Sequence, residues 1–179
     1  MSRRHEALAA LLGYPREGYA REVERSREEL VREEPALAAF LDPFAASVRA
    51  STLEELEELF TNTFDLNPVC ALEVGWQLYG ENYERGRFLA EMQEGLKRAG
   101  LPESPELPDH LTRVLPLLST MPAGEAAELA RRFVLPAVEK MLKGFEGAEN
   151  PFGNVLKAVG LVLRRCTEAV PAGEEVAHG

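Results

Sequence analysis

The residues whose chemistry could matter are few, and the first group is the run Pro108, Asp109 and His110. A proline can begin a helix, and a carboxylate at a helix start can accept hydrogen bonds from free amides and interact favourably with the helix dipole. Helix capping is therefore the simplest role for Asp109 and His110. The same two side chains can also line a binding site, and both interpretations remain open at this point.

Glu73 is the second candidate. It lies in the stretch 69–79, which is almost wholly apolar and contains only one other polar side chain, Gln77. A carboxylate in mostly buried surroundings must be paired, either with an internal group such as Arg85 or His110 or with a cation that a partner brings. The residues alone do not decide between an internal and an external partner.

The common catalytic and metal-binding patterns are missing. Two of the three histidines lie in the terminal segments, and the expected helices carry no Glu-x-x-His pairs of the kind found in di-iron bundles. No glycine-rich phosphate-binding motif is present. Cys70 and Cys166 are 96 positions apart (166 − 70), which favours core packing over a dithiol site. We therefore expect no enzymatic activity, no bound metal and no cofactor.

Composition restricts the partners. The chain has 179 residues, of which 45% are hydrophobic, and 30 acidic against 20 basic side chains give a net charge of −10. A nucleic acid or an anionic membrane surface is a poor partner for such a protein, whereas a basic peptide is attracted. No apolar run reaches the ~20 residues of a membrane span, and the pair Arg3-Arg4 is not followed by a signal-peptide core. We expect a soluble protein of the cytoplasm.

The elements that must position these residues are helices. Helical periodicity punctuated by Pro or Gly runs through nearly the whole sequence, and no segment has the pattern of a strand. Helix starts are expected at Asp42-Pro43, at the capping-box sequence "STLE" from Ser51, at Asn67-Pro68, at Pro108 and at Asn150-Pro151.

Two further features concern the course of these helices. The stretch 69–79 is expected to be a central buried helix. Pro116 and Pro136 are expected to kink the helices that contain them, the second of which should run from about Glu125 to Phe145. We predict an all-α fold in one domain, residues 1–169, with a Pro-rich hinge loop near 100–108 and a disordered tail at 170–179.

Three stretches together resemble a known family. They are "TFDLNPVCALEVGWQLYGENYERGRFL", "ELPDHLTRVLPLL", and "VLPAVEKM" followed by "NPF". The chain resembles the nitrate reductase molybdenum cofactor assembly chaperones, the NarJ or delta-subunit family within the wider TorD-like group, from about Leu8 to Cys166. In that wider group an E-P-x-D-H motif lies at the hinge. Here Glu106 matches its first residue, but Leu107 replaces the proline, which favours the NarJ branch.

The resemblance implies a TorD-like helical bundle that acts as a chaperone and not as an enzyme. Such a protein binds the N-terminal segment of the apo catalytic subunit of a molybdoenzyme, foremost respiratory nitrate reductase, and permits molybdenum cofactor insertion before membrane docking. The cofactor belongs to the client. A client that is another molybdoenzyme with the same type of cofactor, or a role as a retained helical interaction subunit, is the alternative. A monomer or a weak dimer is expected.

The expected peptide site combines the resemblance with the residue types. Aromatic side chains would receive the apolar face of the client segment, and Glu73 with its acidic surroundings would meet basic residues. For Trp76 in particular, simple core packing is an equally good interpretation. The predicted peptide-binding residues are Glu73, Trp76, Tyr79, Tyr83, Arg85, Phe88, Pro108, Asp109 and His110.

Overall fold

The structure is a computed structural model that describes residues 3–170, and within this range every regular element is helical. The prediction of an all-α fold is therefore confirmed. The α-helices are α1 (Arg4–Leu11), α2 (Tyr19–Glu33), α3 (Ala38–Arg49), α4 (Leu53–Phe60), α5 (Val74–Tyr79), α6 (Tyr83–Arg98), α7 (Leu111–Thr120), α8 (Ala123–Leu129), α9 (Leu135–Lys143) and α10 (Phe152–Ala169). Short 3₁₀ turns occupy Pro35–Leu37 and Pro68–Cys70, and π-helical turns occupy Thr61–Asp65 and Ala130–Val134.

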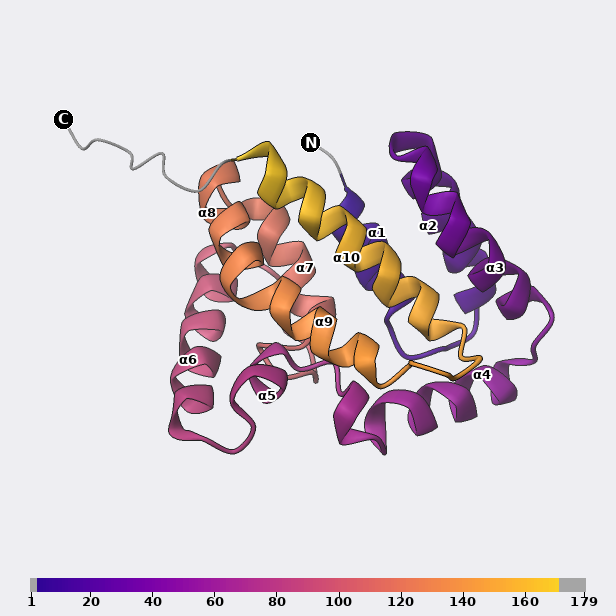
Figure 1. Ribbon diagram of the computed structural model, residues 1–179, viewed down its shortest axis with the longest axis horizontal. Coiled ribbons are helices and arrows are strands. Elements are labelled where there is room, and N and C mark those ends of the chain that lie inside the picture. Colours follow the sequence, from indigo (N-terminus) through magenta and orange to yellow (C-terminus); the bar gives the residue numbers. More distant parts are fainter. Residues whose placement is uncertain (1–2, 171–179) are drawn as a thin grey trace.

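The central helix is α10, which crosses the middle of the molecule in Figure 1 with α1 behind it. It packs on α3 on one side and on α9 on the other, while α1 packs on α2 and α7. The apolar residues on its inner face are buried, namely Phe152, Val155, Leu156, Val159, Val162 and Leu163. The N-cap position of α10 is Pro151 and not Asn150, but the Asn150 side chain accepts a hydrogen bond from the amide of Phe152, the first residue of the helix, across 3.0 Å.

An aromatic cluster connects α10 to the first half of the chain. The ring of Phe152 lies between 5.2 and 5.6 Å, centroid to centroid, from the rings of Phe44, Phe60 and Phe64. These contacts are tilted or edge-to-face, the arrangement that aromatic pairs prefer. The cluster fixes α3, α4 and the turn after α4 against the start of α10.

The predicted central helix at 69–79 is wrong. Only α5 and the 3₁₀ turn Pro68–Cys70 are helical there, and residues 71–73 between them are not. Leu72 and Val74 use their backbone to pair with residues 109–111, so this part of the chain bonds to a distant segment instead of to itself. Asn67 does act as a cap, because its side chain accepts a hydrogen bond from the Val69 amide across 3.2 Å.

Two other helix starts differ from the sequence prediction. Thr52, not Ser51, caps α4: its hydroxyl accepts from the Glu55 amide (3.2 Å), and the Glu55 carboxylate accepts from the Thr52 amide (2.8 Å). The capping box is real but one residue further along the chain. Pro43 does not begin a helix either but lies inside α3. Its helix continues through the proline because the apolar residues on both sides are buried.

The helix around Pro136 is distorted in a way that accommodates the proline ring. The π-helical turn Ala130–Val134 ends two residues before it and contains Arg132, whose carbonyl lies four residues before the proline. A proline ring clashes with that carbonyl in a regular α-helix, and a wider turn relieves the clash. The predicted long helix is therefore present as α8 and α9 with a distortion between them. Pro116 lies inside α7 without interrupting it.

Two remaining expectations concern the chain ends and the membrane. No helix within residues 3–170 is long and apolar enough to cross a membrane. The expected disordered tail, apart from Val170, lies outside the described residues.

Candidate functional site

Two segments far apart in sequence form the frame of the site. The Val74 amide donates to the Asp109 carbonyl and the Leu111 amide donates to the Leu72 carbonyl, each across 2.9 Å. These bonds form an antiparallel bridge between Glu73 and His110. The two candidate residues that the sequence singles out separately therefore lie side by side.

Asp109 is fully buried behind this bridge. Its Oδ2 accepts a hydrogen bond of 2.9 Å from the amide of Gly75, in the first turn of α5. Asp109 thus caps α5 and not the helix that follows it in sequence, which corrects the simplest expectation. Burial raises the pKa of the Asp109 carboxyl, although the Gly75 amide and the charge of Arg85 act in the opposite direction. Its Oδ1 makes no hydrogen bond with any described residue.

His110 caps α7, which begins at Leu111 and not at Pro108. Nδ1 of His110 accepts from the Thr112 amide (3.3 Å) and lies 2.7 Å from the Thr112 hydroxyl. An accepting Nδ1 places the proton of the neutral ring on Nε2, which lies 3.7 Å from the carboxylate of Glu106. Burial lowers the pKa of His110, and the charges of Glu73 and Asp65 partly oppose this shift. Pro108 lies in the turn that leads into this cap.

The side chains around the bridge line a pocket of about 320 Å³, which we call the acidic pocket. Its lining residues are Phe64, Asp65, Pro68, Ala71, Leu72, Glu73, Trp76, Arg85, Glu106 and His110. Three carboxylates converge here from the turn after α4, from the start of α5 and from the loop before α7. Four of the nine predicted site residues, namely Glu73, Trp76, Arg85 and His110, line the pocket together.

The carboxylates of the acidic pocket have little internal compensation. Glu73 makes no ion pair or hydrogen bond through its side chain with any described residue, and the internal partners considered for it, Arg85 and His110, do not form one. Burial raises the pKa of Asp65, the nearby charge of Glu106 raises it further, and His110 acts in the opposite direction. Like charges held this close favour the arrival of a cation. The pocket is therefore suited to a guanidinium or an ammonium group.

Trp76 and Arg85 also line the pocket and contact each other. The indole nitrogen of Trp76 donates to the Pro68 carbonyl across 2.9 Å, and the guanidinium carbon of Arg85 lies 5.5 Å from the centroid of the indole. This distance is within the range of a cation–π contact. Trp76 is half-buried, so it belongs neither wholly to the core nor wholly to the surface. Nε of Arg85 is buried and makes no hydrogen bond with the described residues.

The other predicted aromatic residues lie elsewhere. Phe88 is only 3% exposed and packs against the rings of Tyr79 and Phe133, so the expectation that it lines an open groove is wrong. Tyr79 is partly buried against the core. Tyr83 is 89% exposed at the start of α6 and does not line the acidic pocket.

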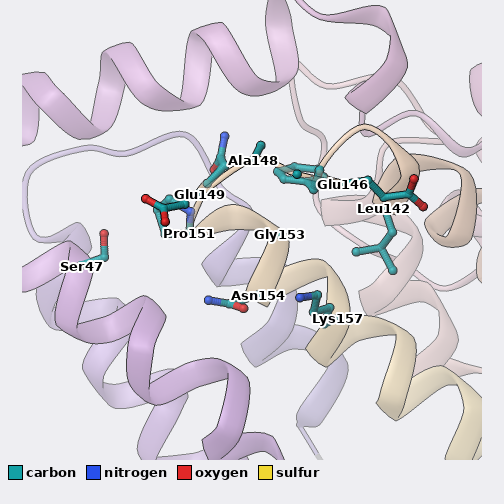
Figure 2. A pocket seen from close by; sticks show the side chains of 12 residues that line it. Ser47, Leu142, Glu146, Ala148, Glu149, Pro151, Gly153, Asn154 and Lys157 are labelled. Carbon is teal, nitrogen blue, oxygen red and sulfur yellow. The ribbon is translucent and has the colours of Figure 1, made fainter.

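A larger hollow of about 680 Å³ lies between α3, the loop after α9 and α10. Figure 2 shows Ser47 on one side, Glu146 and Glu149 from the loop, and Asn154 and Lys157 from α10. No buried polar residue lines it, and the first amides of α10 are already bonded to Asn150. The hollow therefore offers no buried unpartnered polar group to a ligand, and we assign the candidate site to the smaller acidic pocket.

Sequence reasoning missed Asp65. Its carboxylate lines the acidic pocket, but the chain holds 30 acidic residues and nothing in the local sequence distinguishes this one. The only signal is its position just before the Asn67-Pro68 turn. Within residues 3–170, no cluster of three His, Cys, Asp or Glu side chains is arranged to hold a metal ion.

The comparison with protein families identifies the chain's relatives. The model of the family described as nitrate reductase delta subunit matches residues 26–152, which is more than half of the chain and includes every residue that lines the acidic pocket. The chain belongs to the nitrate reductase delta subunit family. This is a family of nitrate reductase assembly chaperones that partner the catalytic subunit, so the resemblance noted in the sequence is confirmed. No curated protein sequence matches the chain.

Proposed function

We propose that this protein binds the N-terminal segment of the apo catalytic subunit of respiratory nitrate reductase, with a basic side chain of that segment in the acidic pocket. The observation that carries the proposal is the convergence of Asp65, Glu73 and Glu106, none of which forms an ion pair with an Arg or Lys of the described residues. A carboxylate cluster of this kind is satisfied by a charge that a partner brings.

The surroundings of the pocket support an amphipathic occupant. Leu66 and Leu107 are 71% and 45% exposed, and each directly follows a carboxylate of the pocket, Asp65 or Glu106. These exposed side chains and half-buried Trp76 offer apolar surface next in sequence to, or within, the pocket lining. A segment with basic and apolar side chains on one face can use both features at once. The net charge of −10 attracts such a segment before contact.

The role in assembly follows from this binding. While its N-terminal segment is held, the catalytic subunit is kept in its apo form, so that the molybdenum cofactor can be inserted before the subunit docks at the membrane. The cofactor and its chemistry belong to the client. The residues of the acidic pocket bind and orient a peptide and carry out no covalent step.

The test is calorimetric titration with a synthetic peptide that copies the first ~20 residues of the nitrate reductase catalytic subunit from the same organism. We expect a Kd on the order of micromolar that weakens as salt is raised, since exposed charge pairs are screened. Glu73→Gln and Asp65→Asn should each weaken binding about two- to fivefold. Glu28→Gln on α2 removes the same charge from an exposed site outside the pocket and is the matched control.

Two results would count against the proposal. One is a wild-type protein that is folded and does not bind the peptide. The other is equal affinity for the wild type, the Glu73 variant and the Glu28 control. Co-purification adds an independent check, because a chaperone is expected with the apo catalytic subunit only, whereas a retained interaction subunit would be stoichiometric with the mature enzyme.

A further inference from the structure

A second hollow adjoins the acidic pocket and shares Glu106 and His110 with it. Its volume is about 420 Å³, and it lies between the end of α1, the end of α4 and the loop before α7. The two hollows thus meet at these two residues, where Nε2 of His110 lies 3.7 Å from the Glu106 carboxylate.

The lining of the second hollow is different in character. Ala9, Ala10, Leu12, Phe60 and Pro105 give it mostly apolar walls, so we call it the apolar pocket. Tyr14 also lines it and is 39% exposed, with its ring edge-on to that of Phe60 at a centroid distance of 5.4 Å. A partly exposed aromatic ring beside apolar walls is the type of contact that contributes most to peptide binding.

Charge also distinguishes the two pockets. Arg16 lines the apolar pocket and offsets one of its two carboxylates, Glu6 and Glu106, so this pocket is less negative than the acidic pocket. The acidic pocket has three carboxylates against Arg85. A peptide with both kinds of residue is therefore expected to place a basic side chain in the acidic pocket and an apolar side chain in the apolar pocket, and not the reverse.

We propose that the apolar pocket holds an apolar side chain of the same client segment whose basic side chain lies in the acidic pocket, and that the Tyr14 ring is its main contact. This inference rests on the proposed function. Side chains three or four positions apart on one helix are neighbours, about 5–6 Å apart at Cβ, which suits two pockets separated only by His110 and Glu106. Tyr14 is then a specificity-determining residue.

The experiment uses the peptide of the preceding section in a double-mutant design. Each apolar residue of the peptide is replaced by Ala in turn, and every peptide is titrated into the wild type and into Tyr14→Ala. We expect Tyr14→Ala to weaken binding of the natural peptide about five- to twentyfold while the dependence on salt is unchanged. One of the Ala-substituted peptides should lose affinity for the wild type but not for Tyr14→Ala.

Two further variants guard against a trivial result. Ala10→Leu adds volume to the half-buried lining of the apolar pocket without removing core contacts, and it should weaken binding in the same way. Leu53→Ala removes an apolar side chain with the same 39% exposure from α4 outside both pockets and should bind as the wild type does. Circular dichroism melting confirms that each variant is folded.

The outcomes distinguish failure of the proposed function from failure of the inference about the apolar pocket. If the wild type does not bind, the proposed function fails. If the wild type binds and Glu73→Gln weakens binding, but Tyr14→Ala and Ala10→Leu do not, the proposed function stands and this inference is overturned. The inference would also be overturned if the interaction energy between Tyr14 and the peptide, measured by these double-mutant cycles, were the same at every apolar position of the peptide.

Discussion

The amide of Gly75 donates to Oδ2 of Asp109 across 2.9 Å, and a Cβ atom at position 75 would lie 2.7 Å from the same oxygen. Phe88 and Arg85 would be 3.1 and 3.3 Å from that Cβ. Residue 75 must therefore be glycine because of close approach and not because of its backbone angles. The contact positions α5, and with it Trp76 and one wall of the acidic pocket.

Gly75→Ala should lower the free energy of unfolding by about 2 kcal/mol, since a methyl group must displace a buried carboxylate that α5 needs as its cap. Gly86→Ala on α6 is the control, because a Cβ there meets open space. The control is expected to stabilise the protein by about 0.5–1 kcal/mol through helix propensity. Urea unfolding followed by circular dichroism measures both. Equal urea midpoints for the two variants would show that a methyl group at position 75 is tolerated as well as one at position 86.

Asp109→Asn tests the buried carboxyl through pH. Burial raises the pKa of Asp109 in the folded protein, so the contribution of this group to stability is greatest below its unfolded pKa and is lost as pH rises through the folded pKa. The wild type should therefore gain stability relative to Asp109→Asn as pH falls from 7 toward 4. Urea midpoints across this range give the difference in stability between the wild type and Asp109→Asn. If this difference does not change with pH, the pKa of the Asp109 carboxyl is not raised in the folded protein.

Asp109→Ala should behave differently from the amide variant. It leaves the Gly75 amide without its acceptor, and an unsatisfied buried donor costs about 1–3 kcal/mol. The loss is expected at both ends of the pH range, because it comes from the missing acceptor and not from the charge. Comparison of the two variants in the same urea series separates hydrogen bonding from ionisation.

Trp76 should report occupation of the acidic pocket. It is the chain's only tryptophan, so the intrinsic fluorescence comes from this residue alone, and it is half-buried in the wall of the pocket. Binding of the basic peptide should shift its emission to shorter wavelength and reduce quenching by acrylamide, because the indole loses contact with water. A peptide in which every Lys and Arg is replaced by Gln is the control and should cause no shift. A shift of equal size with the control peptide would show that the emission of Trp76 does not report binding of a basic side chain in the acidic pocket.

Thr52→Ala should cost about 1 kcal/mol of stability through loss of the capping box at α4. Ser51→Ala, one residue earlier, removes only a hydroxyl that bonds back to the Ser47 carbonyl within the end of α3. This bond contributes little to helix stability, so a smaller loss is expected. Thermal melting of the two variants compares them directly. A larger loss of stability for Ser51→Ala than for Thr52→Ala would indicate that Ser51, and not Thr52, caps α4.

The fold class could be predicted because helical periodicity and Pro or Gly punctuation are local signals. The course of residues 69–79 could not be predicted, because the backbone of Leu72 and Val74 bonds to residues 109–111. An apolar stretch with no polar face looks the same whether it is a buried helix or a turn followed by a paired segment. Tertiary hydrogen bonds of this kind leave no trace in a periodic pattern.

The site could be predicted in part for similar reasons. Glu73 and His110 stand out as a lone acid in an apolar stretch and a lone internal histidine, and they are neighbours in the structure. Phe88 shares its helical spacing with buried Met92 and Leu96, so the signal for its burial was present in the sequence. The convergence of Asp65 with Glu106 depends on folding alone.

The bridge between Glu73 and His110 closes a loop that contains α5, α6 and the segment before α7. The Val74 and Leu111 amides are both held by acceptors on the opposite segment, so neither hydrogen bond can open without loosening the other. Their amide protons should therefore show the same protection from exchange with deuterium, as members of a single cooperative opening unit. A ligand that occupies both sides of His110 would slow that exchange for the two amides together.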